Sequence, residues 1–311
     1  MNFRLLRLPP LLCAAGITAL LCGCAEPRTQ EQMQEAESSL QTQVVNSASQ
    51  QQQPHQAVAL TRLVPVPAGI HRPLYPGKSE PKELPVVAFL LEEHAVTNAQ
   101  YLDFVNANPK WQRSQVRALF ADANYLLHWP ANLEIPTESA NSPVTNVSWF
   151  AARAYAEWIG RRLPTLAEWE YVGVASETSA YGRDEEGYNQ HILNWYGRPT
   201  PIVPEPVLSH APNFYGVSDM HGLIWEWVDD FNTALVSGES RGDSSLDRNL
   251  FCGSGSIGAA DPSDYAAFMR FAFRSSLEAH YTTRNQGFRC AVDAATESAG
   301  TPISSDPLIE E

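Results

Sequence analysis

Two cysteines, Cys252 and Cys290, are the residues with the most distinctive potential chemistry. The chain has five cysteines, and the other three, Cys13, Cys22 and Cys24, lie within its first 24 residues. Two thiols can form a disulfide in an oxidising compartment, bind a soft metal such as Cu(I), or stay buried and inert. A disulfide requires the two Cα atoms to lie within roughly 7 Å of each other. We expect either a disulfide or two separately buried thiols, because nothing local positions the pair for metal or redox work.

Oxygen ligands recur at a spacing typical of a calcium site in the stretch DMHGLIWE. Asp219 and Glu226 would supply carboxylates, and the backbone carbonyls of Gly222 and Ile224 could complete the shell of a hard cation. The alternative is a pair of surface carboxylates. We expect one structural Ca²⁺ ion here.

Histidines are the next class of metal ligand to consider. Four of them, His191, His210, His221 and His280, lie in the second half of the chain without close metal-binding spacing. We therefore expect them to face solvent or to be hydrogen-bonded in the interior.

The first 23 residues have the composition of a secretory signal. Arg4 and Arg7 precede an uncharged apolar stretch that is too short for a stable membrane span. Leu21–Cys24 then resembles a bacterial lipobox, which predicts cleavage before Cys24 and acylation of this residue with palmitate-type chains. The alternative is an ordinary signal peptide with a chance cysteine. Ala25 replaces the aspartate that would retain a lipoprotein in the inner membrane, so we expect a periplasm-facing anchor, in the outer rather than the inner membrane.

The charge of the chain excludes one class of partner. The full sequence carries a formal charge of −14, and loss of the two arginines of the signal leaves −16. Such a chain repels nucleic acid and anionic lipid surfaces. We expect no nucleic-acid binding.

Composition divides the chain into four parts. Residues 1–23 form the signal, and residues 24–60 are a Gln- and Ser-rich tether that cannot bury enough apolar surface to order itself. Residues 61–294 have the length of one large domain. Residues 295–311 form a flexible acidic tail.

Local patterns predict three short helices in the domain. Thr97 with Gln100, and Thr165 with Glu168, are capping boxes, and Ser148 is a plausible N-cap for the segment between them. The rest of the domain is dense in Pro, Gly, Trp and Tyr and has few alternating runs. We therefore expect an α+β domain that is low in regular secondary structure.

Several short motifs occur in one order along residues 62–293: VTNAQY, PVTNVSW, RLPTLAEWEY, WEW and GFR. Together they resemble the formylglycine-generating enzyme family, also called the sulfatase-modifying-factor domain. The resemblance implies a single domain related to C-type lectin folds, a structural calcium ion at Asp219–Glu226, and oxidation of a sulfatase cysteine to formylglycine with oxygen and copper. Relatives of this fold do other work, some of them beside nitrite-reductase gene clusters, so the fold does not fix the reaction.

The chain departs from the family at the copper site. The family binds Cu(I) between two cysteines on one short segment. The corresponding residues here are Ile257 and Pro262, or Asp261 and Ala266 when counted back from the arginines of RFAFR. Neither alignment supplies a thiol, so we expect no copper site and no formylglycine activity.

Weak candidates for other chemistry lie near this segment. Asp261, Asp264 and Tyr265 could act as acid/base groups or could shape an acidic loop. Ser254 matches an active-site serine of the family or only holds a turn. Cys252 could contribute to a rearranged thiol site.

Three arginines follow the same segment. Arg270, Arg274 and Arg289 belong to the family motifs RFAFR and GFR. Guanidinium groups suit carboxylate recognition, and the chain has an excess of Asp and Glu. We expect these arginines to form structural ion pairs.

Three functional hypotheses remain. The first, which we favour, is a lipid-anchored accessory protein without formylglycine activity that aids maturation of a periplasmic partner, such as the metalloenzyme nitrite reductase. The second is an oxidase with altered chemistry in the same pocket. The third is a formylglycine-generating oxidase that uses Cys252 in a rearranged site.

Overall fold

The protein is described by a computed structural model that places residues 59–74, 82–232 and 263–294. These residues all belong to one unit, Ala57–Glu311. Within the part of the chain so described, no helix has the length and apolarity needed to cross a membrane.

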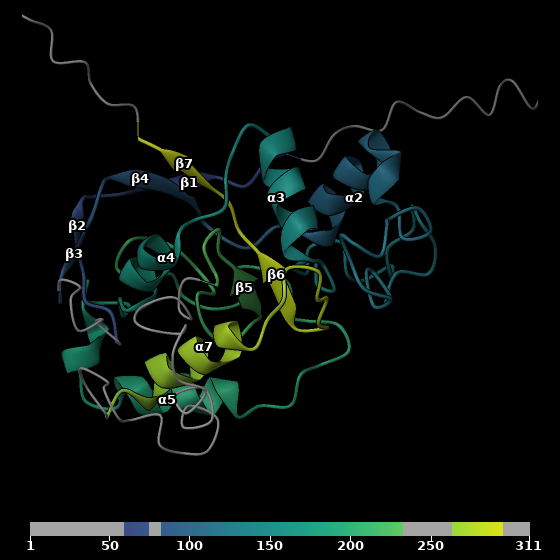
Figure 1. The fold of residues 1–311 in the computed structure, drawn as a ribbon. Helices are drawn as coiled ribbons and strands as arrows, with labels where there is room; N and C mark the ends of the chain where they lie inside the picture. The colour runs from purple at the N-terminus through teal and green to yellow at the C-terminus, as the bar shows by residue number, and fades with distance from the viewer. Residues whose placement is uncertain (1–58, 75–81, 233–262, 295–311) are drawn as a thin grey trace, which may run out of the picture. The chain divides into compact units, whose positions relative to one another are not determined.

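Three small sheets join distant parts of the sequence (Figure 1). The first is antiparallel, with the order β1 (Leu63–Val66), β4 (Phe89–Glu92) and β7 (Ala291–Asp293). The second pairs β2 (Gly69–His71) with β3 (Leu84–Val86), also antiparallel. The third pairs β5 (Trp225–Trp227) with β6 (Gln286–Phe288) in parallel.

The helices are short, and all three predicted helices are confirmed. The capping boxes at Thr97 and Thr165 are both complete, and the Ser148 side chain accepts a hydrogen bond from the N–H of Ala151. These signals alone predict a helix start because side-chain oxygens satisfy the orphan N–H groups of the first turn. The helices are α2 (Asn98–Ala107), α3 (Trp149–Trp158), α4 (Leu166–Gly173), α5 (Tyr188–Tyr196) and α7 (Tyr265–Ser275), with 3₁₀ turns η1 (Pro109–Trp111) and η2 (Gly182–Asp184).

An aromatic cluster fills the core between α2, α3 and β6. Tyr101 stacks on Tyr155 with ring centroids 5.7 Å apart, and Phe288 lies edge-on to both rings. Such pairs add to the stability gained from burial alone. The combination of short helices with small sheets confirms the expected α+β class.

Helices α5 and α7 pack against each other, away from the pair α2 and α3 (Figure 1). Helix α7 comes directly after the segment that the sequence aligns with the copper cysteines. A site at the position of the family's copper cysteines would therefore lie next to α7, whose neighbour is α5.

Candidate functional site

The segment aligned with the family's cysteine pair ends in the first turn of α7. Ala266, one of the aligned positions, is 1% exposed. Asp264 is the N-cap of the helix and accepts a hydrogen bond from the N–H of Ala267 at 2.8 Å. Its second oxygen forms an ion pair with Arg183, so the whole carboxylate has a structural role.

The other catalytic candidates fall into two groups. Tyr265 is 53% exposed, and its ring contacts that of Phe268 with centroids 5.4 Å apart. The remaining candidates lie outside the described residues: Cys252, Ser254, Ile257, Asp261 and Pro262. Asp264 and Tyr265 are neighbours in sequence, but their side chains lie in different environments. Asp264 is buried at the helix cap, and Tyr265 faces solvent.

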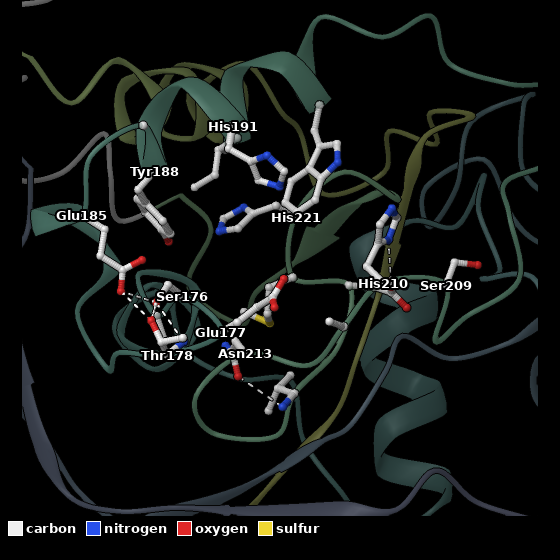
Figure 2. A pocket seen from close by; sticks show the side chains of 18 of the residues that line it. Ser176, Glu177, Thr178, Glu185, Tyr188, His191, Ser209, His210, Asn213 and His221 are labelled. Carbon is white, nitrogen blue, oxygen red and sulfur yellow. Dashed lines mark hydrogen bonds and ion pairs between the residues drawn. The ribbon is translucent and has the colours of Figure 1, made fainter.

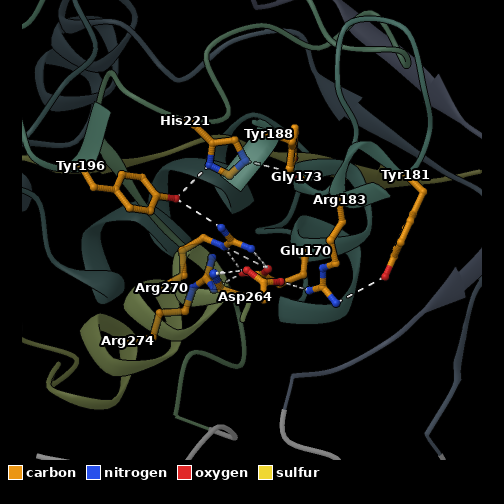
Figure 3. A network of polar contacts seen from close by, with 11 residues as sticks. Glu170, Gly173, Tyr181, Arg183, Tyr188, Tyr196, His221, Asp264, Arg270 and Arg274 are labelled. Atoms are coloured by element: carbon orange, nitrogen blue, oxygen red, sulfur yellow. Dashed lines mark hydrogen bonds and ion pairs between the residues drawn. The ribbon is translucent and has the colours of Figure 1, made fainter. Parts of the chain in front are cut away.

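A largely buried carboxylate is held by two guanidinium groups of α7 (Figure 3). Glu170 of α4 accepts hydrogen bonds from Arg270 at 2.8 and 3.0 Å, and it also pairs with Arg274. Burial opposes ionisation of Glu170, but the charges of the two arginines outweigh it and lower the pKa of this carboxyl. This confirms that Arg270 and Arg274 are structural ion-pair partners, which tie α7 to α4.

The network continues from Arg270 through Tyr196 to His221 (Figure 3). Arg270 donates to the Tyr196 hydroxyl at 3.4 Å, and that hydroxyl lies 2.9 Å from Nδ1 of His221. Nε2 of His221 lies 2.6 Å from the carbonyl oxygen of Gly173, which can only accept, so Nε2 carries the proton. Burial, reinforced by the charge of Arg270, lowers the pKa of His221 to about 3. The imidazole is therefore neutral at physiological pH.

A second buried ion pair lies between β5 and β6. Arg289 and Glu226 are both 0% exposed, and the guanidinium contacts both carboxylate oxygens at 2.8 Å. The remaining donors of Arg289 bind the carbonyl oxygens of Glu92, Glu93 and Ser218 at 3.0 to 3.2 Å. All five donors of this guanidinium are thus used.

The two carboxylates of the expected calcium site have separate partners. Glu226 accepts from Arg289 and from the indole N–H of Trp169 at 2.7 Å. Asp219 accepts from the backbone N–H of Leu208 at 2.6 Å and contacts Nδ1 of His210 at 2.8 Å. Donors thus occupy both carboxylates, and the guanidinium on Glu226 does not fit a second cation beside it. The calcium prediction stays a prediction, and the response to chelation tests it.

The other two members of the expected calcium shell have different surroundings. Gly222 adopts φ +90°, and an added Cβ would lie 2.8 Å from the indole ring of Trp195. Only glycine permits this close approach. Ile224 is buried, directly before β5. The glycine in DMHGLIWE therefore has a packing role that does not depend on a metal.

Cys290 is a free thiol with 0% exposure. Its backbone N–H donates to the buried carboxylate of Glu92 at 2.6 Å. Burial, with the nearby charge of Glu92, raises the pKa of the thiol well above its usual range. A thiolate is therefore strongly disfavoured at Cys290. The possible disulfide stays a prediction, since Cys252 lies outside the described residues.

A cavity of about 890 Å³ opens beside α5 (Figure 2). Its floor includes three buried apolar side chains, Ile192, Val217 and Met220. Three glutamates, Glu177, Glu185 and Glu186, line it together with one arginine, Arg198. The volume falls in the range of small-ligand pockets.

Three histidines surround one tryptophan in this cavity. The ring of Trp195 lies 4.3 Å from that of His191 and 5.3 Å from that of His210, and the His221 ring is 6.5 Å away. Among the described residues, no three side chains of His, Cys, Asp or Glu are arranged to hold a metal ion. The expectation of solvent-facing or internally satisfied histidines holds for His221, whose two ring nitrogens are both hydrogen-bonded.

The sequence did not reveal this cluster as a site. His191 and Trp195 are four residues apart on α5 and so share one face, which is the one local signal. His210 and His221 join them from a long irregular segment, which only the tertiary fold can position. The fourth candidate, His280, lies apart, beside Glu278 at 3.6 Å and half-exposed.

Most of the chain is similar to known proteins. The family described as Sulfatase-modifying factor enzyme 1-like domain matches residues 47–294. Formylglycine-generating enzyme of Mus musculus is 29% identical over 88% of this chain and 86% of its own length. That of Streptomyces coelicolor is 34% identical over 66% of this chain and 78% of its own length. A solved structure of PvdO from Pseudomonas aeruginosa covers 75% of this chain and 95% of its own, with 19% identity and a TM-score of 0.42.

Proposed function

Because the chain belongs to the sulfatase-modifying-factor family, to which the formylglycine-generating enzymes also belong, we propose that it is an accessory member without formylglycine activity. It is held at the periplasmic face of a membrane by a lipid on Cys24. There it aids maturation of a partner protein, for which a periplasmic metalloenzyme such as nitrite reductase is our candidate.

One observation carries this proposal. Ala266, one of the positions aligned with the family's copper cysteines, is buried in the first turn of α7. Asp264 caps this helix and forms an ion pair with Arg183. A copper dithiolate needs two soft ligands on one short segment. Within residues 61–294 the sequence has two cysteines, Cys252 and Cys290, and they are 38 positions apart. Cys290, the thiol that the structure describes, is buried and protonated.

We predict that the protein forms no formylglycine. The assay supplies Cu(I), oxygen and a peptide with the sequence Cys-x-Pro-x-Arg, and mass spectrometry follows conversion of the thiol to the aldehyde. A formylglycine-generating enzyme of the family serves as the positive control. Aldehyde formation that is lost in the Cys252→Ser variant would overturn the proposal in favour of a rearranged thiol site.

An oxidase with altered chemistry is the second candidate in the same pocket. Among its possible acid/base groups, Tyr265 is exposed, whereas the Asp264 carboxylate is fully engaged. This candidate predicts that the protein consumes oxygen in the presence of the same peptide but forms no aldehyde. The Tyr265→Phe variant would then lose this oxygen consumption.

We predict that Cys24 carries the lipid anchor. Arg4, Arg7 and the lipobox-like Leu21–Cys24 motivate this prediction. Intact-mass analysis of the membrane fraction is expected to show an acylated N-terminal cysteine, and a Cys24→Ser variant is expected in the soluble fraction. Unmodified wild-type protein cleaved at another position would contradict it.

A further inference from the structure

The stretch from Phe104 to Ala121 carries cations without carboxylates. It contains Lys110, Arg113 and Arg117 but no Asp or Glu, whereas the whole chain has 35 acidic side chains and 21 of Lys and Arg. The ion pairs between described residues use other arginines. In the part of the chain that the structure describes, no carboxylate therefore neutralises these three charges.

The cations gather around one pair of aromatic rings. Lys110 directly precedes Trp111, whose ring centroid lies 6.0 Å from that of Phe120. The guanidinium of Arg117 lies over the ring of Phe120, 5.8 Å from its centroid. Lys110 and Arg117 are both exposed, and Arg113 lies between them in sequence. Their charges thus face solvent within one neighbourhood of the fold.

Two exposed leucines adjoin these cations. Leu119 is 66% exposed, two residues after Arg117. Leu127 is 50% exposed, and its carbonyl oxygen accepts a hydrogen bond from Arg113 at 3.4 Å. Apolar side chains that adjoin Lys and Arg are typical of surfaces that contact a membrane. The side chains of six residues make up what we call the basic surface: Lys110, Arg113, Arg117, Leu119, Phe120 and Leu127.

Two carboxylates near the basic surface have partners of their own. Asp122 accepts hydrogen bonds from the N–H of Thr282 at 3.1 Å and from its hydroxyl. Glu157 of α3 pairs with Arg153 at 3.0 Å. More distant carboxylates are screened, because the Debye length is about 8 Å at physiological ionic strength. The negative charge of the whole chain disfavours contact with anionic lipid in general, but it does not cancel the local positive charge of this surface.

The chemistry of the basic surface fits a bilayer with anionic lipids. Headgroup phosphates accept hydrogen bonds from Lys and Arg, and each such cation near an anionic membrane strengthens binding. Apolar side chains beside the cations can enter the boundary between headgroups and acyl chains. A bilayer needs no pocket, and the cavity of about 890 Å³ lies elsewhere, beside α5.

We propose that the basic surface docks the domain on a bilayer that contains anionic phospholipid. The proposal rests on the membrane location in the proposed function and adds a second contact to it, one that fixes which face of the domain turns to the lipid. A lipid on Cys24 makes docking an intramolecular step, so that a weak affinity of the surface suffices.

Cosedimentation with vesicles tests the proposal. The protein is the mature chain that begins at residue 24, with Cys24→Ser so that no lipid is attached. The vesicles contain phosphatidylcholine alone or phosphatidylcholine with phosphatidylglycerol. We expect binding to the anionic vesicles and not to the neutral ones, and we expect it to weaken as salt increases, because salt screens the attraction.

Variants of the exposed side chains locate the contact. Lys110→Gln and Arg117→Gln should each weaken binding roughly fivefold, and the double variant about 25-fold, as for the loss of one and two cations near an anionic membrane. Leu119→Ser should also weaken it. Lys82→Gln, an exposed lysine before β3, is the matched control and should bind like the wild type. Unchanged melting temperatures verify that the variants are folded.

Several outcomes would overturn the proposal. They are equal binding to neutral vesicles, wild-type affinity of the double variant, and no measurable binding at millimolar lipid. If the protein binds the acidic peptide acetyl-Glu-Leu-Glu-Leu-Glu-amide but no vesicles, the basic surface is a protein interface and the lipid assignment is wrong. Intact-mass analysis reports separately on the lipid at Cys24, so that docking and anchoring can fail independently.

Discussion

Replacement of Arg289 by methionine is expected to lower the free energy of unfolding by about 3–5 kcal/mol, the usual result of leaving one member of a buried ion pair alone. Glu226 would remain 0% exposed without its guanidinium, and the carbonyl oxygens of Glu92, Glu93 and Ser218 would lose donors. Urea-induced unfolding measures this loss. A change below about 1 kcal/mol would contradict the role assigned to the pair.

The matched control is Arg153→Met. Arg153 pairs with Glu157 on the surface of α3, where the two side chains are 51% and 64% exposed. Exposed pairs of this kind contribute roughly 0.3–0.5 kcal/mol. The difference in unfolding free energy between the two arginine variants therefore measures the effect of burying the ion pair, apart from the effect of losing an arginine side chain.

The same measurement decides between the two interpretations of Glu226. If Glu226 is a calcium ligand, a chelator destabilises the wild-type protein, because an ion that binds only the folded state stabilises it. The Glu226→Gln variant would then show no response to the chelator. If Glu226 serves only the ion pair with Arg289 and the hydrogen bond from Trp169, neither protein responds to the chelator and Glu226→Gln loses much of its stability.

The second large effect is expected in the pH dependence of stability. The pKa of His221 is lowered to about 3 in the folded protein, whereas that of an unfolded histidine is about 6.5. Below pH 6.5 the unfolded chain binds a proton that the folded chain does not. Stability is thus fully present above pH 6.5 and falls with decreasing pH, by about 1.4 kcal/mol per pH unit from this group.

A His221→Gln variant isolates this contribution. Other histidines with pKa values lowered by burial, such as His71, His94 and His128, act in the same direction, so the wild-type slope alone does not report on His221. Between pH 5 and 6 we expect the variant to lose about 1.4 kcal/mol less than the wild type. Parallel slopes for His221→Gln and wild type would contradict the neutral, buried state of His221.

The parts of the fold that sequence predicted are those governed by local chemistry. The helices after Thr97, Ser148 and Thr165 begin where a side-chain oxygen can satisfy the first free N–H groups. The structural role of Arg270 and Arg274 followed from the excess of carboxylates, although the identity of their partner, Glu170, did not.

The parts that sequence missed depend on tertiary contacts. Sequence alone offers Asp264 as an acid/base group or as part of an acidic loop, because it lies in the segment that replaces the copper cysteines, whereas the fold uses it to start α7. The parallel pairing of β5 with β6 brings together segments 61 positions apart. The cavity combines one face of α5 with an irregular segment that carries His210 and His221. That segment has no periodic hydrophobic pattern, so the sequence does not predict where its histidines lie.

The pairing of the last strand with an early one has a consequence for synthesis. Residues of β7 pair with β4, and Arg289 binds the carbonyl oxygen of Glu92, 197 positions earlier. A nascent chain that has not yet released residue 293 from the ribosome lacks these contacts, and β4 then has an unpaired edge. Contacts of such high sequence separation slow folding, and unpaired edges invite association with other chains. The interval between emergence of β4 and release of β7 is therefore when a holding chaperone would protect this domain most.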